Sequence, residues 1–212
     1  MIFFLIVLGF TLVAAPIAEG QPVSEFTNDE RSQTLFDGNV SHGGYGGLIF
    51  GITSVNGQPA FMRGRRGAWI LNFSDEHALN LGLGSYRTRN DFNPVEWTID
   101  EVSEPDMRTN YSGFEIEYVN RSYQLVHFSV GSLIGSGNVR YDDRDIDVGR
   151  TRDSYFVLQP GVDLNINITN WFRISAGLSY RYASSVNLAG TSNEDLSGVS
   201  GILGLRFGGF GI

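Results

Sequence analysis

Apolar and polar residues alternate along most of the chain after residue 42. In His77–Arg87, for example, Leu79, Leu81 and Leu83 share one face, whereas polar or small residues occupy the other. No stretch after residue 20 shows the sustained period of 3.6 that marks an amphipathic helix. The segments with period-2 alternation, or a close variant of it, are Gly43–Ser54, Pro59–Asn72, His77–Arg87, Tyr111–Val119, Tyr123–Leu133, Ser154–Ile168, Trp171–Ala183 and Gly198–Gly208. The pattern predicts an all-β protein of eight strands.

The connections between these segments alternate in length. They are short at Asn72–Glu76, Asn120–Ser122 and Thr169–Asn170, and long at Asn90–Asn110, Gly135–Asp153 and Ser184–Ser197. The first hairpin is an exception, because Asn56-Gly57 is a strong signal for a two-residue turn. Short turns at one rim and long loops at the other are typical of transmembrane barrels. We therefore expect an eight-stranded antiparallel up-and-down β-barrel of the transmembrane type, with both termini at the short-turn rim.

Alternation alone does not say which face points inward. A soluble lipocalin-like barrel turns its apolar face inward to hold a ligand, whereas a membrane barrel turns it outward to lipid. The polar face is mainly Gly, Ser and Asn, and a soluble exterior would need many long charged side chains. We therefore expect a lipid-facing set made up of Leu79, Leu81, Leu83, Phe114, Ile116, Val126, Phe128, Phe156, Leu158, Phe172, Ile174 and Leu178. A soluble binder of apolar ligands remains an alternative.

Aromatic residues near the predicted strand ends favour the same orientation, because membrane barrels carry aromatic girdles at both interfaces. The expected girdle residues are Trp69, Phe73, Tyr86, Tyr111, Tyr118, Tyr123, Tyr155, Trp171, Tyr180, Tyr182 and Phe207. One strand is irregular: Arg63, Arg65 and Arg66 put charge on both faces of Pro59–Asn72. A β-bulge near Gly64 would account for this change of face.

Composition narrows the class of protein. The 212 residues include no Cys and no Lys, and 15 Arg against 23 acids leave a net charge of −8. The absence of Cys excludes disulfides and thiolate metal sites. The acidic balance argues against nucleic acid as a partner, because nucleic-acid-binding domains usually carry a basic face.

The N-terminal residues predict export. The run from Ile2 to Ala18 is almost wholly apolar, and Ala18-Glu19-Gly20 offers a small-x-small cleavage site. We expect residues 1–20 to be a signal peptide, 21–41 a polar flexible segment and 42–212 the barrel. An uncleaved N-terminal anchor is the alternative, and both readings export the rest of the chain.

Glycine and aromatic patterns in the predicted barrel carry a family resemblance. They are His42–Gly47, Gly64–Ile70, Pro160–Val162, Trp171–Arg173 and Ser179–Tyr182. With these stretches the chain resembles outer-membrane β-barrel proteins and, more narrowly, exported barrel proteins of Bacteroidota-type bacteria. The resemblance implies a place in the bacterial outer membrane, with periplasmic termini and extracellular long loops. It implies no assigned reaction.

Charged residues on the polar face fall in the predicted lumen. They are Glu115, Glu117, His127, Asp163, Arg173, Arg181 and Arg206. Acids and bases in a narrow interior are expected to pair, because an isolated buried charge is costly. We expect a salt-bridged network that closes the barrel, and a gated polar path for small solutes is the alternative.

A lipid-modifying hydrolase is a further alternative. A hairpin turning at 120–122 would set Glu115 nearly opposite His127, with Ser129 on the same face. These residue types can act as orienter, base and nucleophile. The His-x-Ser tripeptide also resembles that of the outer-membrane lipid A deacylases. The three side chains face the predicted lumen, away from lipid substrates, so we expect no catalysis and no cofactor.

Two of the long connections are acidic. Asp residues at alternate positions of Asp142–Asp147 suggest Ca²⁺ ligands, but Val148 and Ser154 stand where an EF-hand needs Gly and Glu. We therefore expect a solvated loop and no metal. The connection after the third strand carries six acids and suits a cationic envelope or surface protein, or divalent ions that bridge it to lipopolysaccharide. A loop that charge repulsion keeps solvated is the alternative. Together these features predict a small closed outer-membrane barrel with a structural or surface-interaction role, whose partners include outer-membrane lipids.

Overall fold

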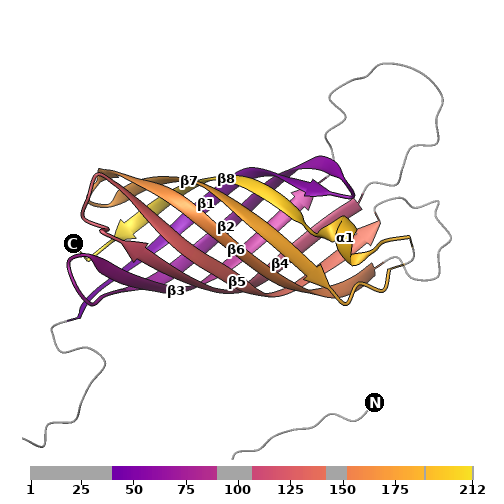
Figure 1. Cartoon of the computed structure of the whole chain (residues 1–212), viewed down its shortest axis with the longest axis horizontal. Helices are drawn as coiled ribbons and strands as arrows, with labels where there is room; N and C mark the ends of the chain where they lie inside the picture. Colours follow the sequence, from indigo (N-terminus) through magenta and orange to yellow (C-terminus); the bar gives the residue numbers. More distant parts are fainter. Residues whose placement is uncertain (1–39, 90–106, 142–151, 189, 212) are drawn as a thin grey trace, which may run out of the picture. The chain divides into compact units, whose positions relative to one another are not determined.

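The computed structural model describes residues 40–89, 107–141, 152–188 and 190–211. The strands are β1 (Ser41–Val55), β2 (Gln58–Asn72), β3 (His77–Arg89), β4 (Met107–Asn120), β5 (Val126–Tyr141), β6 (Arg152–Thr169), β7 (Phe172–Ser184) and β8 (Gly198–Gly209). A four-residue helix, α1 (Asn193–Leu196), lies between β7 and β8. Each strand pairs antiparallel with its neighbour in the chain, and β8 pairs with β1 (Figure 1). The predicted eight-stranded up-and-down barrel is confirmed.

Several predictions from the sequence lie outside the described residues. They concern the signal peptide at 1–20, the polar segment as far as residue 39, and the acidic stretches 90–106 and 142–151. Within the described part of the chain, no helix is long and apolar enough to cross a membrane.

The two ends of the barrel differ. At the short-turn rim the strands are joined at 73–76, 121–125 and 170–171, and β1 begins and β8 ends there (Figure 1). We call the other end the α1 rim. At the α1 rim, Asn56 and Gly57 have φ angles of 52° and 69°. Positive φ at both central residues is what a type I′ hairpin turn requires, so the Asn-Gly signal is confirmed.

Two local predictions are wrong. β5 continues through Gly135–Tyr141, which the sequence assigned to a loop, because its outward residues there are polar and give no apolar face. The bulge near Gly64 is also absent, since β2 pairs in continuous register with both β1 and β3. Arg63 and Arg65 simply face outward and Arg66 inward. The described ladders have a register shift elsewhere, at Asn167/Thr169 between β6 and β7.

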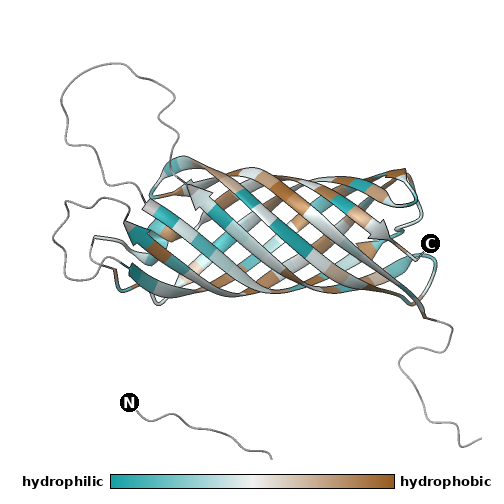
Figure 2. Cartoon of the chain, turned by 180° about the vertical axis from the view of Figure 1, so that it is seen from behind, coloured by the Kyte–Doolittle hydropathy of each residue, from teal (hydrophilic) through white to brown (hydrophobic). Residues whose placement is uncertain are grey.

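The outer wall of the barrel is largely apolar. All twelve residues of the expected lipid-facing set lie on the outer face, seven exposed and five partly exposed. The most open are Leu83 at 69% and Leu178 at 61%. Figure 2 shows the hydrophobic and hydrophilic residues alternating along the strands. This alternation follows from the pleat, which sends successive side chains to opposite faces of the sheet.

The aromatic residues divide between the two faces. Those exposed on the outside are Trp69, Tyr118, Tyr123, Trp171, Tyr180, Tyr182 and Phe207, as a girdle would require. Tyr86, Tyr111 and Tyr155 instead lie inside and are at most 3% exposed, so their assignment to a girdle is wrong. Nearness to a strand end does not decide the face, because a shift of one residue reverses it.

Two apolar clusters fill the barrel interior, one towards each end. The cluster nearer the α1 rim contains Ile49, Val55, Ala60, Met62, Tyr86, Tyr111, Leu133, Val139, Tyr155, Val157, Ala183, Leu188, Leu196 and Ile202. The cluster nearer the short-turn rim contains Tyr45, Ile70, Ala78, Val119 and Phe210. The expected lumen of small polar residues is therefore only part of the interior. Eight strands leave just enough room inside for side chains to fill, and here many of these side chains are apolar.

Helix α1 and its flanks cover the interior at the α1 rim. The Ser192 hydroxyl accepts a hydrogen bond from the Asp195 amide, and the Asp195 carboxylate accepts one from the Ser192 amide. This capping box starts the helix despite its shortness. Leu196 is fully buried in the apolar cluster, and Asn56 N donates to Asp195 O across 2.7 Å. The β7–β8 connection is thus fastened to the β1–β2 turn.

Candidate functional site

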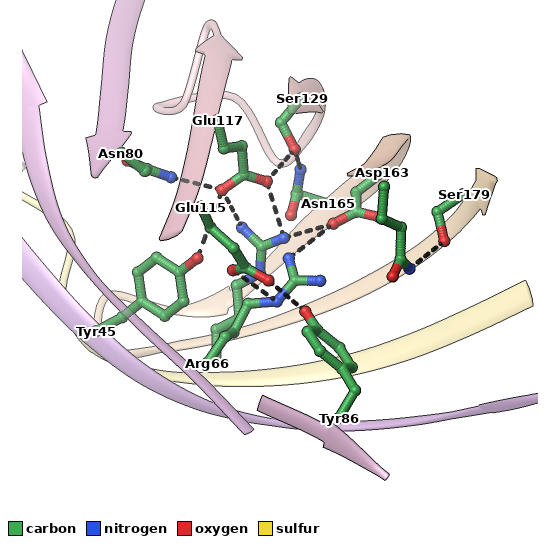
Figure 3. A network of polar contacts seen from close by, with 12 residues as sticks. Tyr45, Arg66, Asn80, Tyr86, Glu115, Glu117, Ser129, Asp163, Asn165 and Ser179 are labelled. Carbon is green, nitrogen blue, oxygen red and sulfur yellow. Dashed lines mark hydrogen bonds and ion pairs between the residues drawn. The ribbon is translucent and has the colours of Figure 1, made fainter. Parts of the chain in front are cut away.

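Five charged side chains meet inside the barrel (Figure 3). They lie between the two apolar clusters, because Tyr86 of one cluster donates to Glu115 and Tyr45 of the other lies near Glu117. We call this group the central cluster. It consists of Arg66 from β2, Glu115 and Glu117 from β4, Asp163 from β6 and Arg206 from β8. All of them come from even-numbered strands and occupy inward positions.

Glycines on the odd-numbered strands make room for these charges. Gly47 on β1 pairs with Arg66 on one side and with Arg206 on the other. A Cβ on Gly47 would lie 2.8 Å from Leu205 O and 3.6 Å from Cγ of Arg206. Gly177 on β7 pairs with Asp163, whose carboxylate would collide with any side chain at that position. The small residues that suggested a polar lumen therefore act as space for larger neighbours.

Arg206 joins two carboxylates. Its Nη1 and Nη2 donate to Oε2 and Oε1 of Glu117, each across 3.0 Å, and Nη2 also donates to Asp163 Oδ2 across 2.6 Å. The Arg206 side chain is only 2% exposed. The bidentate arrangement matches the planar fork of a guanidinium to the two oxygens of a carboxylate. A lysine could not reproduce it.

Arg66 extends the network to the third carboxylate. Its Nη1 donates to Asp163 Oδ2 across 3.3 Å, and its Nε lies 3.6 Å from Glu115 Oε2. The Tyr86 hydroxyl donates to the other oxygen of Glu115. Two guanidinium groups thus face three carboxylates, and neutral donors supply the remaining hydrogen bonds.

Glu117 receives most of these neutral donors. Asn80 Nδ2 donates to Oε2 across 2.7 Å, and the Ser129 hydroxyl donates to Oε1 across 2.6 Å. The Tyr45 hydroxyl lies 3.5 Å from Oε2, and Asn165 Nδ2 donates to the Ser129 hydroxyl across 3.0 Å. Beside the cluster is a cavity of about 50 Å³, which is room for a few water molecules.

The other expected lumen residues lie inside the barrel but apart from the central cluster. His127 and Arg173 are near the short-turn rim, where the Arg173 guanidinium stacks 3.7 Å above the Phe210 ring. Arg181 is near the α1 rim, where it donates from Nε to Leu196 O and from Nη2 to Ser54 O, at 2.6 and 2.9 Å. These arginines are held by backbone carbonyls and aromatic rings rather than by carboxylates.

The proposed arrangement of Glu115, His127 and Ser129 does not form. Glu115 pairs with Leu133 across the β4–β5 ladder, because the turn spans 121–125 and not only 120–122. The Ser129 hydroxyl donates to Glu117, and His127 Nδ1 lies 3.1 Å from Gln124 O. A catalytic triad therefore has no geometric basis in these three residues.

The sequence analysis did not assign several residues of the central cluster and its surroundings to the site. Arg66 was hidden by the expected bulge, although counting alternate positions without a bulge puts it inside. Tyr45, Tyr86, Asn80 and Asn165 carry no signal of their own, because cross-barrel contacts depend on the register. Among the described residues, no group of three His, Asp or Glu side chains could hold a metal ion. The Asp142–Asp147 stretch lies outside that part of the chain.

Comparison with known proteins shows which solved structures share this fold. No protein family and no curated protein matches the sequence. Among solved structures, the Neisserial surface protein A superposes with a TM-score of 0.52 at 16% identity, covering 80% of this chain and 99% of that one. Ail of Yersinia pestis, solved in complex with the heparin analogue sucrose octasulfate, has a TM-score of 0.51 at 16% identity, covering 80% and 98%. The chain therefore has the fold of the eight-stranded outer-membrane β-barrel proteins.

Proposed function

We propose that this protein is a small closed barrel of the bacterial outer membrane, with a structural or surface-interaction role and without catalysis. The observation that carries the proposal is the Arg206 guanidinium held between Glu117 and Asp163 in the middle of the interior. Phe210 covers the interior towards the short-turn rim and Leu196 towards the α1 rim, and each is at most 2% exposed. A solute would have to displace all three groups to pass.

The outer wall supports contact with lipid. Large apolar residues are exposed on every strand, and soluble monomers rarely expose contiguous apolar patches beyond a few hundred Å². The lipocalin-like alternative would require these residues to line the interior. The fold shared with outer-membrane barrels supports the same reading, and the narrower resemblance to Bacteroidota-type barrels stays a prediction.

The unequal connections support an orientation. In outer-membrane barrels the short turns are periplasmic and the longer loops extracellular. We place the short-turn rim on the periplasmic side, together with the start of β1 and the end of β8. The acidic stretches 90–106 and 142–151 then connect strands on the outer side, where we propose that a cationic envelope or surface protein binds.

Single cysteines test this placement cleanly, because the chain has none of its own. Asp75 in the β2–β3 turn and Glu194 in α1 are both exposed acids at opposite rims. In intact cells, a membrane-impermeant maleimide is expected to label Glu194→Cys and not Asp75→Cys. After lysis it is expected to label both variants. The reverse pattern would overturn the orientation. Recovery of the protein in the soluble periplasmic extract would overturn the membrane assignment.

Conductance tests the closed interior. Purified protein in planar lipid bilayers is expected to give no stepwise current, with insertion verified by a heat-dependent shift on SDS gels. Regular single-channel steps from inserted protein would refute the closed barrel and favour the gated polar path.

A further inference from the structure

The outer wall carries arginines in register across adjacent strands near the α1 rim. Arg63 on β2 pairs with Arg87 on β3, Arg108 on β4 pairs with Arg140 on β5, and Arg140 pairs with Arg152 on β6. All of these side chains are on the outer face, with Arg108 partly exposed and the other four exposed. We call these five residues the arginine patch.

This arrangement is unfavourable for the barrel by itself. Like charges directly opposite each other on neighbouring strands destabilise a sheet. Within the described residues, no carboxylate forms an ion pair with Arg63, Arg87 or Arg140. By contrast, the arginines inside the barrel are held by carboxylates, carbonyls or rings. Three arginines without a carboxylate partner among the described residues suggest an anionic ligand that supplies the charge.

The patch has the form of a binding surface. It lines a hollow of about 270 Å³ that also includes Asn110 and Asn138. Asn138 Oδ1 accepts hydrogen bonds from Arg152 Nη2 and from the Ser154 hydroxyl, each across 3.2 Å. These neutral side chains fix the neighbouring donors without cancelling their charge. The residues thus present guanidinium and amide donors and few competing acceptors.

On β5 and β6 the patch lies directly beyond the apolar part of the wall, whereas Arg63 on β2 has the exposed Phe61 on its rim side. On β6 the outward residues run from Arg152 through Ser154 to Phe156, and on β5 from Arg140 through Asn138 and Ser136 to Ile134. At a rise of about 3.3 Å per residue, Arg152 is about 13 Å along the strand from Phe156. With the usual tilt of such strands this is about 10 Å in height. One headgroup layer is about 5–8 Å thick, so Arg152 lies at headgroup level when Phe156 lies at the edge of the acyl chains.

We infer that the arginine patch binds the phosphate groups of lipid headgroups in the leaflet that borders the α1 rim. This inference rests on the proposed membrane insertion. Guanidinium groups bind phosphate oxygens in bidentate fashion, which a chain without lysine is suited to do. The patch crosses five strands, about 19 Å at 4.8 Å per strand interval. That width exceeds a single phosphate and suits a headgroup with two phosphates or several lipids side by side.

The test uses the full-length barrel in nanodiscs of phosphatidylcholine that contain either lipid A with two phosphates or lipid A without phosphates. The melting temperature of the wild type is expected to be about 5–10 °C higher with the phosphorylated lipid, as for a ligand at about 100 times its Kd. Arg87→Gln/Arg140→Gln is expected to lose at least half of this difference. Arg121→Gln, which removes an exposed arginine at the opposite rim, is the matched control and should keep all of it.

A second readout separates binding from folding. In pure phosphatidylcholine, Arg87→Gln/Arg140→Gln is expected to be as stable as the wild type or more stable, because it relieves repulsion. A less stable variant there would mean that acids of the chain already neutralise the patch, and would overturn the inference. Equal melting temperatures with both forms of lipid A would also overturn it.

Further arms of the experiment show whether the phosphate comes from lipid or from solution. They also distinguish a failure of membrane insertion from a failure of phosphate binding. Inorganic phosphate added to phosphatidylcholine discs is expected to leave the melting temperature unchanged, and a full shift would point to a free-anion site instead of lipid. Arg87→Lys/Arg140→Lys is expected to keep only part of the lipid effect, since it retains charge without the bidentate fork. Failure of membrane insertion would appear as no heat-dependent gel shift in any disc, whereas failure of this inference leaves that shift intact.

Discussion

Replacing Arg206 by methionine is expected to destabilise the barrel strongly. The change keeps much of the side-chain volume but removes the hydrogen bonds to Glu117 and Asp163, and leaves both carboxylates buried. Arg66 still lies 3.3 Å from Asp163, so Glu117 loses the larger part of its compensation. Removing one partner of a buried ion pair costs about 3–5 kcal/mol of folding stability, and we expect the loss for Arg206→Met to fall in that range.

The measurement is the free energy of unfolding in lipid vesicles, from urea titration followed by tryptophan fluorescence, to which Trp69 and Trp171 on the outer wall contribute. Arg121→Met is the control, because its ion pair with Glu76 is half exposed and such pairs contribute about 0–1 kcal/mol. Adding Glu117→Gln and Asp163→Asn to Arg206→Met is expected to restore most of the loss, since no charge is then left unpaired. A loss below about 1 kcal/mol for Arg206→Met would refute the reasoning. A triple variant as unstable as the single one would show that packing, not charge, is responsible.

Three further substitutions probe other parts of the barrel by the same titration. Leu83→Arg, at a position 69% exposed in the middle of β3, is expected to cost about 2–4 kcal/mol, and a neutral effect would contradict contact with lipid. Ser129→Ala takes a donor from Glu117 and an acceptor from Asn165, and is expected to cost about 1–3 kcal/mol, whereas no loss would mean that water replaces the hydroxyl. Phe210→Ala empties the short-turn end of the interior and is expected to cost about 3–5 kcal/mol, a value that a loosely packed end would not reach.

The strands and their outer face were predictable because membrane-type alternation is strict where one face meets an apolar surrounding. Leu79, Leu81 and Leu83 could face only one way once the strand was recognised. The signal weakens where β5 passes Ser136, Asn138 and Arg140, because outward polar residues beyond the apolar belt look like a loop. How far a strand continues beyond its apolar outward residues is therefore set by pairing with the neighbouring strands. The sequence of one segment alone does not show this pairing.

The candidate site was predictable only in part. The alternation of inward and outward positions along a strand puts Glu117, Asp163 and Arg206 inside the barrel. Because an isolated buried charge is costly, these acids and the arginine are then expected to form ion pairs. Which partners meet depends on the register across the barrel, and this is fixed by turn lengths. The β4–β5 turn illustrates the point: its extra residues move the partner of Glu115 from His127 to Leu133. Arg66 was lost for the opposite reason, since a bulge was invoked to explain arginines that in fact face both ways.

The inner and outer arginines differ in what they do for the fold. Arg206 and Arg66 each join two carboxylates, so their presence is explained by the stability of the closed interior. Arg140, between Arg108 and Arg152, has like charge on both sides, which opposes strand pairing. Residues that work against the fold point to function more strongly than residues that support it, because stability alone gives no reason to keep them. On this argument the interior of the barrel is its framework, and its interactions are to be sought on the outer wall at the α1 rim.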